Sequence, residues 1–244
     1  MKLSSLNKGL VGHWTMSQDS LKGSLLADKT PYENDGTIYG ATFTTDRKGK
    51  ANSAMSFDGV DDHISLLNSL GLTRNISKLT LSCWINIPLI SLSSTAVFIS
   101  FGRGGTDGAR SQILIKNGKY GIGGRRLDSD DYTELYGGTT STGWHLLTGM
   151  FDYANKSVFL YLDGVKIAEN TDFLTAGNTS DTDSAGAKIG KQYDASFPFN
   201  GSIDDVRIYN RVLSETEIKA LYDSYNPKIV MKTSLPKIKL YGGD

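Results

Sequence analysis

The sequence has few of the residues that build disulfide frameworks, zinc sites or strongly charged surfaces. Its only cysteine, Cys83, excludes an intramolecular disulfide and a multi-cysteine zinc site. Basic and acidic residues number 26 each, so the formal net charge is zero. Nucleic-acid binders concentrate basic charge on one face, and charge-driven membrane attachment needs a basic surface. We therefore expect no nucleic-acid partner and no attachment to lipid by charge alone.

Long hydrophobic runs are also missing. No window approaches the roughly 18 apolar residues that span a bilayer, so no membrane insertion is expected. Residues 1–12 contain neither the apolar core nor the small-residue cleavage site of a secretory signal. We expect the protein to act where it is made, or to leave the cell by a route that reads no cleaved signal. Assembly into a virus particle would be one such route, and the sequence does not fix the localisation further.

What the chain does contain indicates an all-β protein. Hydrophobic residues make up 39% of its 244 residues, which is enough to close a sizeable core. The 27 glycines and the scarcity of helix-favouring runs indicate many tight turns and short strands. Residues 78–87 (KLTLSCWINI) alternate aliphatic with polar or aromatic side chains, which is the period of a half-buried strand. Residues 157–169 contain two β-rich runs around Asp163-Gly164, a pair that suits a two-residue hairpin.

One helix is predicted near the C-terminus. Ser214 and Glu217 form a capping box, in which the hydroxyl and the carboxylate satisfy first-turn amides. From Ile218, apolar residues recur at i, i+3, i+4 and i+7, and Pro227 ends the pattern. Residues 227–244 are basic and lack domain-like patterning, so we predict an extended tail, either disordered or docked on a neighbour as an added strand.

Eight segments taken together resemble the LamG-like jelly-roll domains of the concanavalin A-like lectin/glucanase superfamily. In chain order they are GLVGHWTM, DKTPYENDGT, MSFDGVDDHISL, LTLSCWINI, GWHLLTGMFD, VFLYLDGVKIA, AKIG and FNGSIDDVRIYNRVLSETEIKALY. The resemblance implies a two-sheet antiparallel jelly-roll β-sandwich with one short C-terminal helix and an extended tail. The expected organisation is an N-terminal lead over 1–8, a jelly-roll domain over 9–226 and the tail over 227–244.

Members of this superfamily include both enzymes and noncatalytic binding modules, so the residues must decide between them. Retaining glycosidases need two carboxylates about 5 Å apart, commonly on one strand as E-x-D-x-E, and the sequence contains no such motif. The three histidines lie far apart and show no triad or H-x-x-x-H spacing. These observations favour a noncatalytic protein.

The resemblance also implies a structural calcium ion where an early loop meets the closing I-D-[DE] strand. The loop here runs from Asp28 to Gly36 and keeps Asp28 and Asn34, and Asp204 would be the carboxylate from the closing strand. Calcium prefers such oxygen ligands. The family glycines are replaced by Pro31 and Glu33, however, so Asp28 and Asn34 can equally be turn formers, with Asp204 paired to a basic neighbour such as Arg207.

A second acidic cluster, Asp58, Asp61 and Asp62, allows the same two interpretations. The cluster could hold a second ion, but an Asp58-Gly59 turn explains it without one, and we predict the turn.

For a sugar ligand, we look for aromatic residues that stack on the ring and polar residues that bind hydroxyls. Two glycine-rich stretches, 102–108 and 121–126, are predicted hairpin tips that carry arginines. The predicted ligand-binding residues in and near these tips are Arg103, Asp107, Tyr120, Arg125, Arg126, Tyr132 and Tyr136.

These residues lead to a noncatalytic module that binds a carbohydrate or glycoconjugate and that calcium stabilises. The alternative is a decoration or appendage subunit of a virus particle, in which residues 228–244 bind a protein partner or a second copy. A glycan-active enzyme is the third hypothesis.

Overall fold

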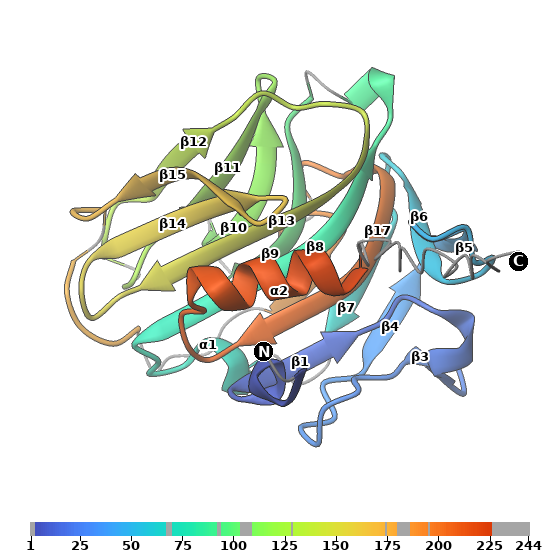
Figure 1. Cartoon of the computed structure of the whole chain (residues 1–244), viewed down its shortest axis with the longest axis horizontal. Coiled ribbons are helices and arrows are strands. Elements are labelled where there is room, and N and C mark those ends of the chain that lie inside the picture. Colours follow the sequence, from blue (N-terminus) through green and yellow to red (C-terminus); the bar gives the residue numbers. More distant parts are fainter. Residues whose placement is uncertain are drawn as a thin grey trace, which may run out of the picture.

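The chain folds into two antiparallel sheets packed face to face, which confirms the predicted jelly-roll sandwich (Figure 1). The structure is a computed structural model, and it describes residues 3–66, 70–91, 94–102, 109–127, 129–173, 175–179, 186–194 and 196–225. The predicted tail, and with it the proposed assembly contact through residues 228–244, lies outside these residues. None of the helices in the described part is long and apolar enough to cross a membrane.

The first sheet, sheet A, is built around three adjacent ten-residue strands. Its spatial order is β15 (Val165–Asn170), β14 (Ser157–Leu162), β13 (Gly143–Asp152), β8 (Lys78–Ile87), β17 (Asn200–Tyr209), β6 (Ala54–Asp58) and β5 (Thr42–Thr44), and β1 (Leu10–Trp14) pairs with β17. The closing strand β17 therefore lies beside β1, the first strand of the chain, as well as beside β8 and β6.

The second sheet, sheet B, is wider. Its spatial order is β12 (Thr133–Gly137), β11 (Lys119–Gly124), β10 (Ala109–Lys116), β9 (Ala96–Gly102), β16 (Gly186–Ile189), β7 (His63–Leu66), β4 (Gly36–Tyr39), β3 (Leu25–Leu26) and β2 (Leu21–Lys22). The helical elements of the described residues are η1 (Leu3–Asn7), η2 (Gln18–Ser20), α1 (Leu70–Thr73), η3 (Leu89–Ser91) and α2 (Glu215–Tyr225).

The core lies between the sheets, and the alternation of β8 is confirmed. One set of its side chains, Leu79, Leu81, Cys83, Ile85 and Ile87, is fully buried in this core. Burial raises the pKa of the Cys83 thiol, because the thiolate would lose its solvation. Cys83 is therefore a small apolar residue of the core.

The outer face of sheet A is covered by α2, which crosses β13, β8 and β17 (Figure 1). Trp84, on the outward side of β8, packs in a second apolar cluster with Ile218 and Leu221 of the helix. The capping box is confirmed: the Ser214 backbone N–H donates to the Glu217 carboxylate at 3.0 Å, and the Glu217 N–H donates to the Ser214 hydroxyl at 3.3 Å.

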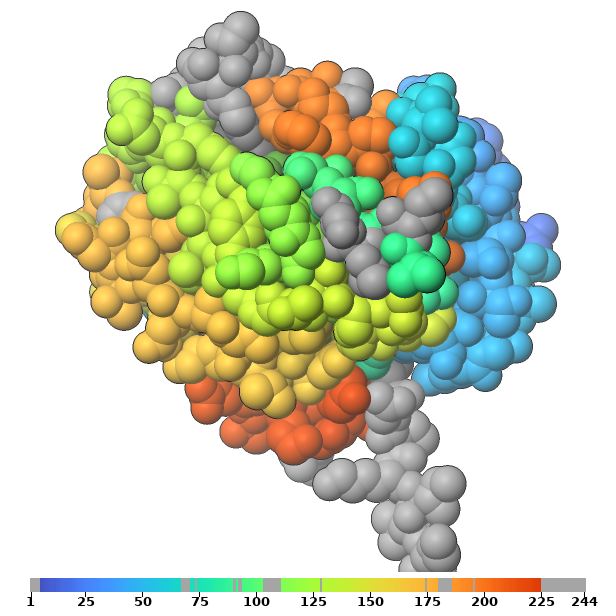
Figure 2. Space-filling view, turned by 90° about the horizontal axis from the view of Figure 1, so that it is seen from above, coloured from blue at the N-terminus to red at the C-terminus, as the bar shows by residue number. Residues whose placement is uncertain are grey.

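The outer face of sheet B is different, because α2 lies on one side of the sandwich only (Figure 2). On β10, Gln112, Leu114 and Lys116 lie on the outer side and alternate with Ile113 and Ile115 of the core, and of these three only Lys116 is partly exposed. The outer face of sheet B therefore mixes polar with apolar side chains, whereas that of sheet A packs against α2.

Candidate functional site

A polar row crosses the outer face of sheet B. Strand register places seven outward residues side by side: Glu134, Gly123, Gln112, Ser100, Lys188, Ser65 and Thr37. They come from seven neighbouring strands, from β12 to β4. Because adjacent strands lie about 4.8 Å apart, the row spans roughly 29 Å. Gly123, Gln112 and Ser100 in the middle of the row are buried, whereas Glu134 at one side and Lys188, Ser65 and Thr37 at the other are partly exposed.

Two tyrosines lie at the β12 end of this row, over glycines of β11. A Cβ atom added to Gly123 would come within 2.1 Å of the Tyr132 hydroxyl oxygen, and one added to Gly121 within 2.8 Å of the Tyr136 ring. The glycines therefore let both side chains lie close against the sheet. Both tyrosines are partly exposed, so they are accessible from outside.

A hydrogen-bond network fixes the tyrosines. Gln112 Nε2 donates to the Tyr132 hydroxyl, and both tyrosine hydroxyls donate to the Glu134 carboxylate. Lys116 Nζ donates to the same carboxylate at 2.8 Å and lies 5.9 Å from the centre of the Tyr136 ring. We call Gln112, Lys116, Tyr132, Glu134 and Tyr136 the tyrosine surface.

The tyrosines of this surface keep their protons. Burial raises the pKa of Tyr132 and of Tyr136, and the neighbouring Glu134 raises both further. Each hydroxyl is therefore a hydrogen-bond donor throughout the neutral pH range. The surface combines aromatic rings, an amide, a carboxylate and an ammonium group, which are the groups that bind sugars.

The other predicted ligand residues do not join this surface. Tyr120 is fully buried between the sheets, because side chains of β11 alternate and that of Tyr120 points inward. The prediction that Tyr120 lies on the ligand-binding surface is therefore wrong. The Arg125 side chain, just after β11, is also buried. Arg126 is held by another loop, since its Nε donates to Thr175 Oγ1 at 2.7 Å. Arg103 and Asp107 lie outside the described residues.

Three residues of the tyrosine surface were missing from the predicted site: Gln112, Lys116 and Glu134. A weak signal for the first two was present, because a strand over residues 112–116 (QILIK) has period two and so places Gln112 and Lys116 on one face together with Leu114. The sequence could not show that this face meets Tyr132 and Tyr136. That juxtaposition depends on the register of β10, β11 and β12.

The predicted calcium loop is closed by its own hydrogen bonds. The Asp28 carboxylate accepts the backbone N–H groups of His13, Thr30 and Asn34, the Thr30 hydroxyl and the Asn34 side-chain amide, at 2.7–3.2 Å. A carboxylate offers about four lone-pair sites, so these contacts saturate it. Glu33 has φ 52°, so it takes the left-handed conformation where the resemblance has a glycine.

Asp204 is paired elsewhere. Its carboxylate accepts a hydrogen bond from Arg47 Nη1, and the two side chains are only 4% and 8% exposed. The Arg47 guanidinium also lies 4.9 Å from the centre of the Trp84 ring, and Trp84 is the register partner of Asp204 on β8. The basic neighbour of Asp204 is thus Arg47, and not Arg207 as the alternative interpretation suggested.

A β-bulge explains how the closing strand meets the early loop. Register shifts between Asp204 and Arg207, and Asp205 has φ 47°. The bulge turns Asp205 toward His13, whose Nε2 lies 2.7 Å from Asp205 Oδ1, and toward Arg207, whose Nε lies 3.1 Å from Oδ2. These groups line an open cleft of about 400 Å³ together with Arg47 and Asp204. His13 of β1 therefore connects the loop to the closing strand: its backbone N–H donates to Asp28, and its ring contacts Asp205.

Calcium at Asp28, Asn34 and Asp204 stays a prediction from the resemblance, but the donors as placed do not fit the ion. Asp28 is saturated and Asp204 is neutralised by an arginine. We expect the melting temperature to be the same in calcium as in chelator, each at about 5 mM, a concentration that saturates structural calcium sites. A clear fall in chelator would show that the loop rearranges to take the ion.

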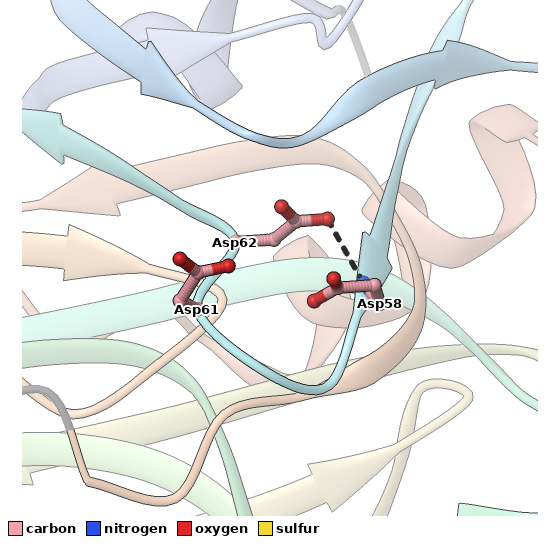
Figure 3. Close-up of side chains that lie close together, drawn as sticks. All are labelled: Asp58, Asp61 and Asp62. Carbon is pink, nitrogen blue, oxygen red and sulfur yellow. Dashed lines mark hydrogen bonds between the residues drawn. The ribbon is translucent and has the colours of Figure 1, made fainter.

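The second acidic cluster forms a turn (Figure 3). Carboxylate oxygens of Asp58, Asp61 and Asp62 lie within 4.8 Å of one another. Asp62 Oδ2 accepts the Asp58 backbone N–H at 2.9 Å, and Asp58 Oδ1 accepts the Val60 N–H at 2.8 Å. Burial raises the pKa of Asp62, and the charges of Asp58 and Asp61 raise it further. These bonds are those of an aspartate-rich turn, which confirms the turn prediction.

The comparisons with known proteins agree with this fold. Residues 58–219 match the concanavalin A-like lectin/glucanases superfamily. The chain belongs to this family. No curated protein matches the chain by sequence.

Among solved structures, one similar domain is domain 4 of AbnA, a GH43 extracellular arabinanase from Geobacillus stearothermophilus, in complex with arabinotriose. The match has a TM-score of 0.64 and 20% identity, and it covers 87% of this chain and 98% of that domain. The ligand-binding domain of botulinum neurotoxin serotype D, in complex with N-acetylneuraminic acid, has a TM-score of 0.68 and 14% identity over 91% of this chain and 52% of that one. The present chain thus spans about half the length of the neurotoxin domain.

Proposed function

We propose that the protein is a noncatalytic carbohydrate-binding domain and that the tyrosine surface of sheet B is its binding site. The observation that carries this proposal is the pair Tyr132 and Tyr136, which lie over Gly123 and Gly121 on the face that α2 leaves uncovered. Their hydroxyls are already tied to Glu134. The surface is therefore pre-organised, and binding would immobilise few side chains.

The chemistry of the surface matches a sugar ring. The C–H face of a pyranose or furanose packs on an aromatic ring, while its hydroxyls need donors and acceptors at the rim. Here Glu134 and Lys116 supply a carboxylate and an ammonium group beside the rings, while the buried Gln112 holds the Tyr132 hydroxyl.

Two structural neighbours support the same function. One of them is a domain of an arabinanase seen with arabinotriose, and the other is a neurotoxin domain seen with N-acetylneuraminic acid. At 20% and 14% identity these likenesses concern the fold. The ligand class for this chain comes from its own tyrosine surface.

Binding without hydrolysis follows from the charges of the site. The tyrosine surface contains one carboxylate, Glu134, and Lys116 is bonded to it. Retaining glycosidases use two carboxylates about 5 Å apart. We therefore expect a polysaccharide panel to release no reducing ends in the presence of the protein, even where the protein binds.

Replacement of Tyr136 by alanine tests the site. Removing an aromatic anchor at the centre of an interface costs about 2 kcal/mol, so the affinity for the best-bound neutral polysaccharide should fall at least tenfold or so. Affinity electrophoresis against arabinan, xylan, β-glucan and mannan measures this change.

Tyr32→Ala is the matched control, because Tyr32 is 57% exposed and lies in the loop at Asp28–Gly36, away from the tyrosine surface. Its affinity should equal that of the wild-type protein. An equal loss in both variants, or no loss in Tyr136→Ala, would contradict the proposed site. Binding of no glycan by the wild-type protein would contradict the function.

A further inference from the structure

Lys188 occupies a central position in the polar row. Strand β16 places it between Ser65 of β7 and Ser100 of β9, and its chain neighbours Ala187 and Ile189 point into the core. The Lys188 side chain is therefore on the outer face of sheet B, where it is partly exposed. It shares this face with the tyrosine surface.

Lys188 forms no ion pair with another described residue. In the described part of the chain, no carboxylate lies within salt-bridge distance of its ammonium group. The nearby Lys191 repels it, and Asp194 attracts it. Burial lowers the pKa of Lys188, and the charge of Lys191 lowers it further. An anion bound at this position would stabilise the charged form of Lys188 against both its burial and the repulsion by Lys191.

A hydrogen-bonding group beside Lys188 is also unsatisfied. Ser100 is fully buried, and its hydroxyl has no hydrogen-bond partner among the described residues. Buried hydroxyls nearly always have partners, so an orphan of this kind needs an explanation. Ser100 lies directly opposite Lys188 in the ladder and on the same face. An anion bound beside the ammonium group would accept a hydrogen bond from this hydroxyl.

The rest of the neighbourhood is cationic and aromatic. Lys191 Nζ donates to the Asp61 carbonyl at 3.0 Å, which fixes a second ammonium group near Lys188. His63, the next outward residue along β7 from Ser65, has a lowered pKa because of burial and of Lys191 and Lys188, although Asp61 opposes this. The ring of Tyr39 stacks on His63 at 4.6 Å with an angle of 7°. This pair offers an aromatic surface beside the positive charges.

We propose that Lys188, Lys191 and Ser100 form a subsite for the anionic group of an acidic glycan, a carboxylate or a sulfate ester. The inference rests on the proposed function and names the class of glycan. Four strand spacings of about 4.8 Å separate the Glu134 and Lys188 positions of the row, so roughly 19 Å lies between the two sites. An oligosaccharide that reaches from the tyrosine surface to Lys188 would use both.

Paired polysaccharides test this subsite. Dextran sulfate is compared with dextran, and polygalacturonate with its methyl ester, by isothermal titration calorimetry of the full chain. We expect the wild-type protein to bind one acidic form at least about tenfold more tightly than its neutral counterpart, and the preference to shrink as salt rises. The pair that shows the preference tells a sulfate ligand from a carboxylate ligand.

Lys188→Gln should remove this preference and leave affinity for the neutral counterpart unchanged. Lys219→Gln is the matched control, because Lys219 is an exposed lysine on α2 at the opposite side of the sandwich. The control should retain the preference. Equal binding of acidic and neutral forms by the wild-type protein, or a preference that survives in Lys188→Gln, would overturn the subsite alone.

Tyr136→Ala separates the two proposals. If both hold, this variant loses affinity for acidic and neutral glycans alike. If acidic glycans still bind and depend on Lys188 while Tyr136→Ala has no effect, the subsite stands and the tyrosine surface is wrong. If no glycan binds at all, the proposed function and the subsite are both overturned.

Discussion

Replacing Arg47 with alanine should lower the free energy of unfolding by about 3–5 kcal/mol, the cost of leaving a buried charge unpaired. The Asp204 carboxylate is 4% exposed and is hydrogen-bonded to Arg47. Without the arginine, this carboxylate must stay charged without a partner, take up a proton or draw in water. The variant also loses the contact between the guanidinium and the Trp84 ring. Urea denaturation followed by tryptophan fluorescence measures the change.

Lys50→Ala is the control for this measurement. Lys50 belongs to the same turn and pairs with Asp19, but the two side chains are 63% and 81% exposed. Loss of this ion pair should therefore cost about 1 kcal/mol or less. A similar small loss for Arg47→Ala would show that Asp204 does not depend on the arginine.

The double variant Arg47→Met, Asp204→Asn separates charge from packing. It removes both charges, so no unpaired charge remains, and we expect it to be more stable than Arg47→Ala. If it is equally unstable, the loss comes from packing against Trp84 rather than from the buried carboxylate.

Acid should destabilise the protein through Glu217 between about pH 5 and pH 2. Arg211 donates two hydrogen bonds of 2.8 Å to the Glu217 carboxylate, which together with the Ser214 cap lowers the pKa of this group to about 2. Because the folded pKa lies below the ordinary value of 4.5, the folded state binds fewer protons than the unfolded state in this range. The stabilisation is complete above pH 5 and is lost as the pH falls through 2. Its size is about 2–3 kcal/mol.

Urea denaturation at pH 7, 4 and 2.5 tests this pH dependence in Glu217→Gln. The variant should be less stable than the wild-type protein at pH 7 and should lose less stability on acidification. Glu215→Gln is the control from the same helical turn, since Glu215 is 72% exposed and lies 3.8 Å from Lys166. If acid destabilises Glu217→Gln as much as the wild-type protein, other carboxylates cause the effect.

Much of the fold could be predicted because local patterns agreed with the final packing. The alternation over Lys78–Ile87 placed Cys83 in the core, and the hairpin around Asp163-Gly164 formed with both residues at positive φ. The capping box fixed the start of α2 at Glu215. In each case the signal lies within about ten residues of sequence, so long-range contacts were not needed to detect it.

The candidate site was predicted in part. Tyr132 and Tyr136 lie together on an accessible face, but Tyr120, two residues from Ile122 on β11, shares its inward side and is buried. Tyrosine is common both in cores and on surfaces, so residue type alone cannot separate the two places. The side of the strand decides, and a one-residue change in register would reverse it.

The sequence by itself determined the all-β class, the strand faces, the capped helix and the family, because these depend on short-range periodicity and on motif order. Only the tertiary structure decided which charges meet. The bulge at Asp204 and Asp205 turns two adjacent carboxylates to partners 157 and 192 residues away, Arg47 and His13. Strict alternation would have sent them to opposite faces. The meeting of Gln112 with Tyr132, and of Ser100 with Lys188, likewise results from strand pairing between distant segments, and no local pattern encodes it.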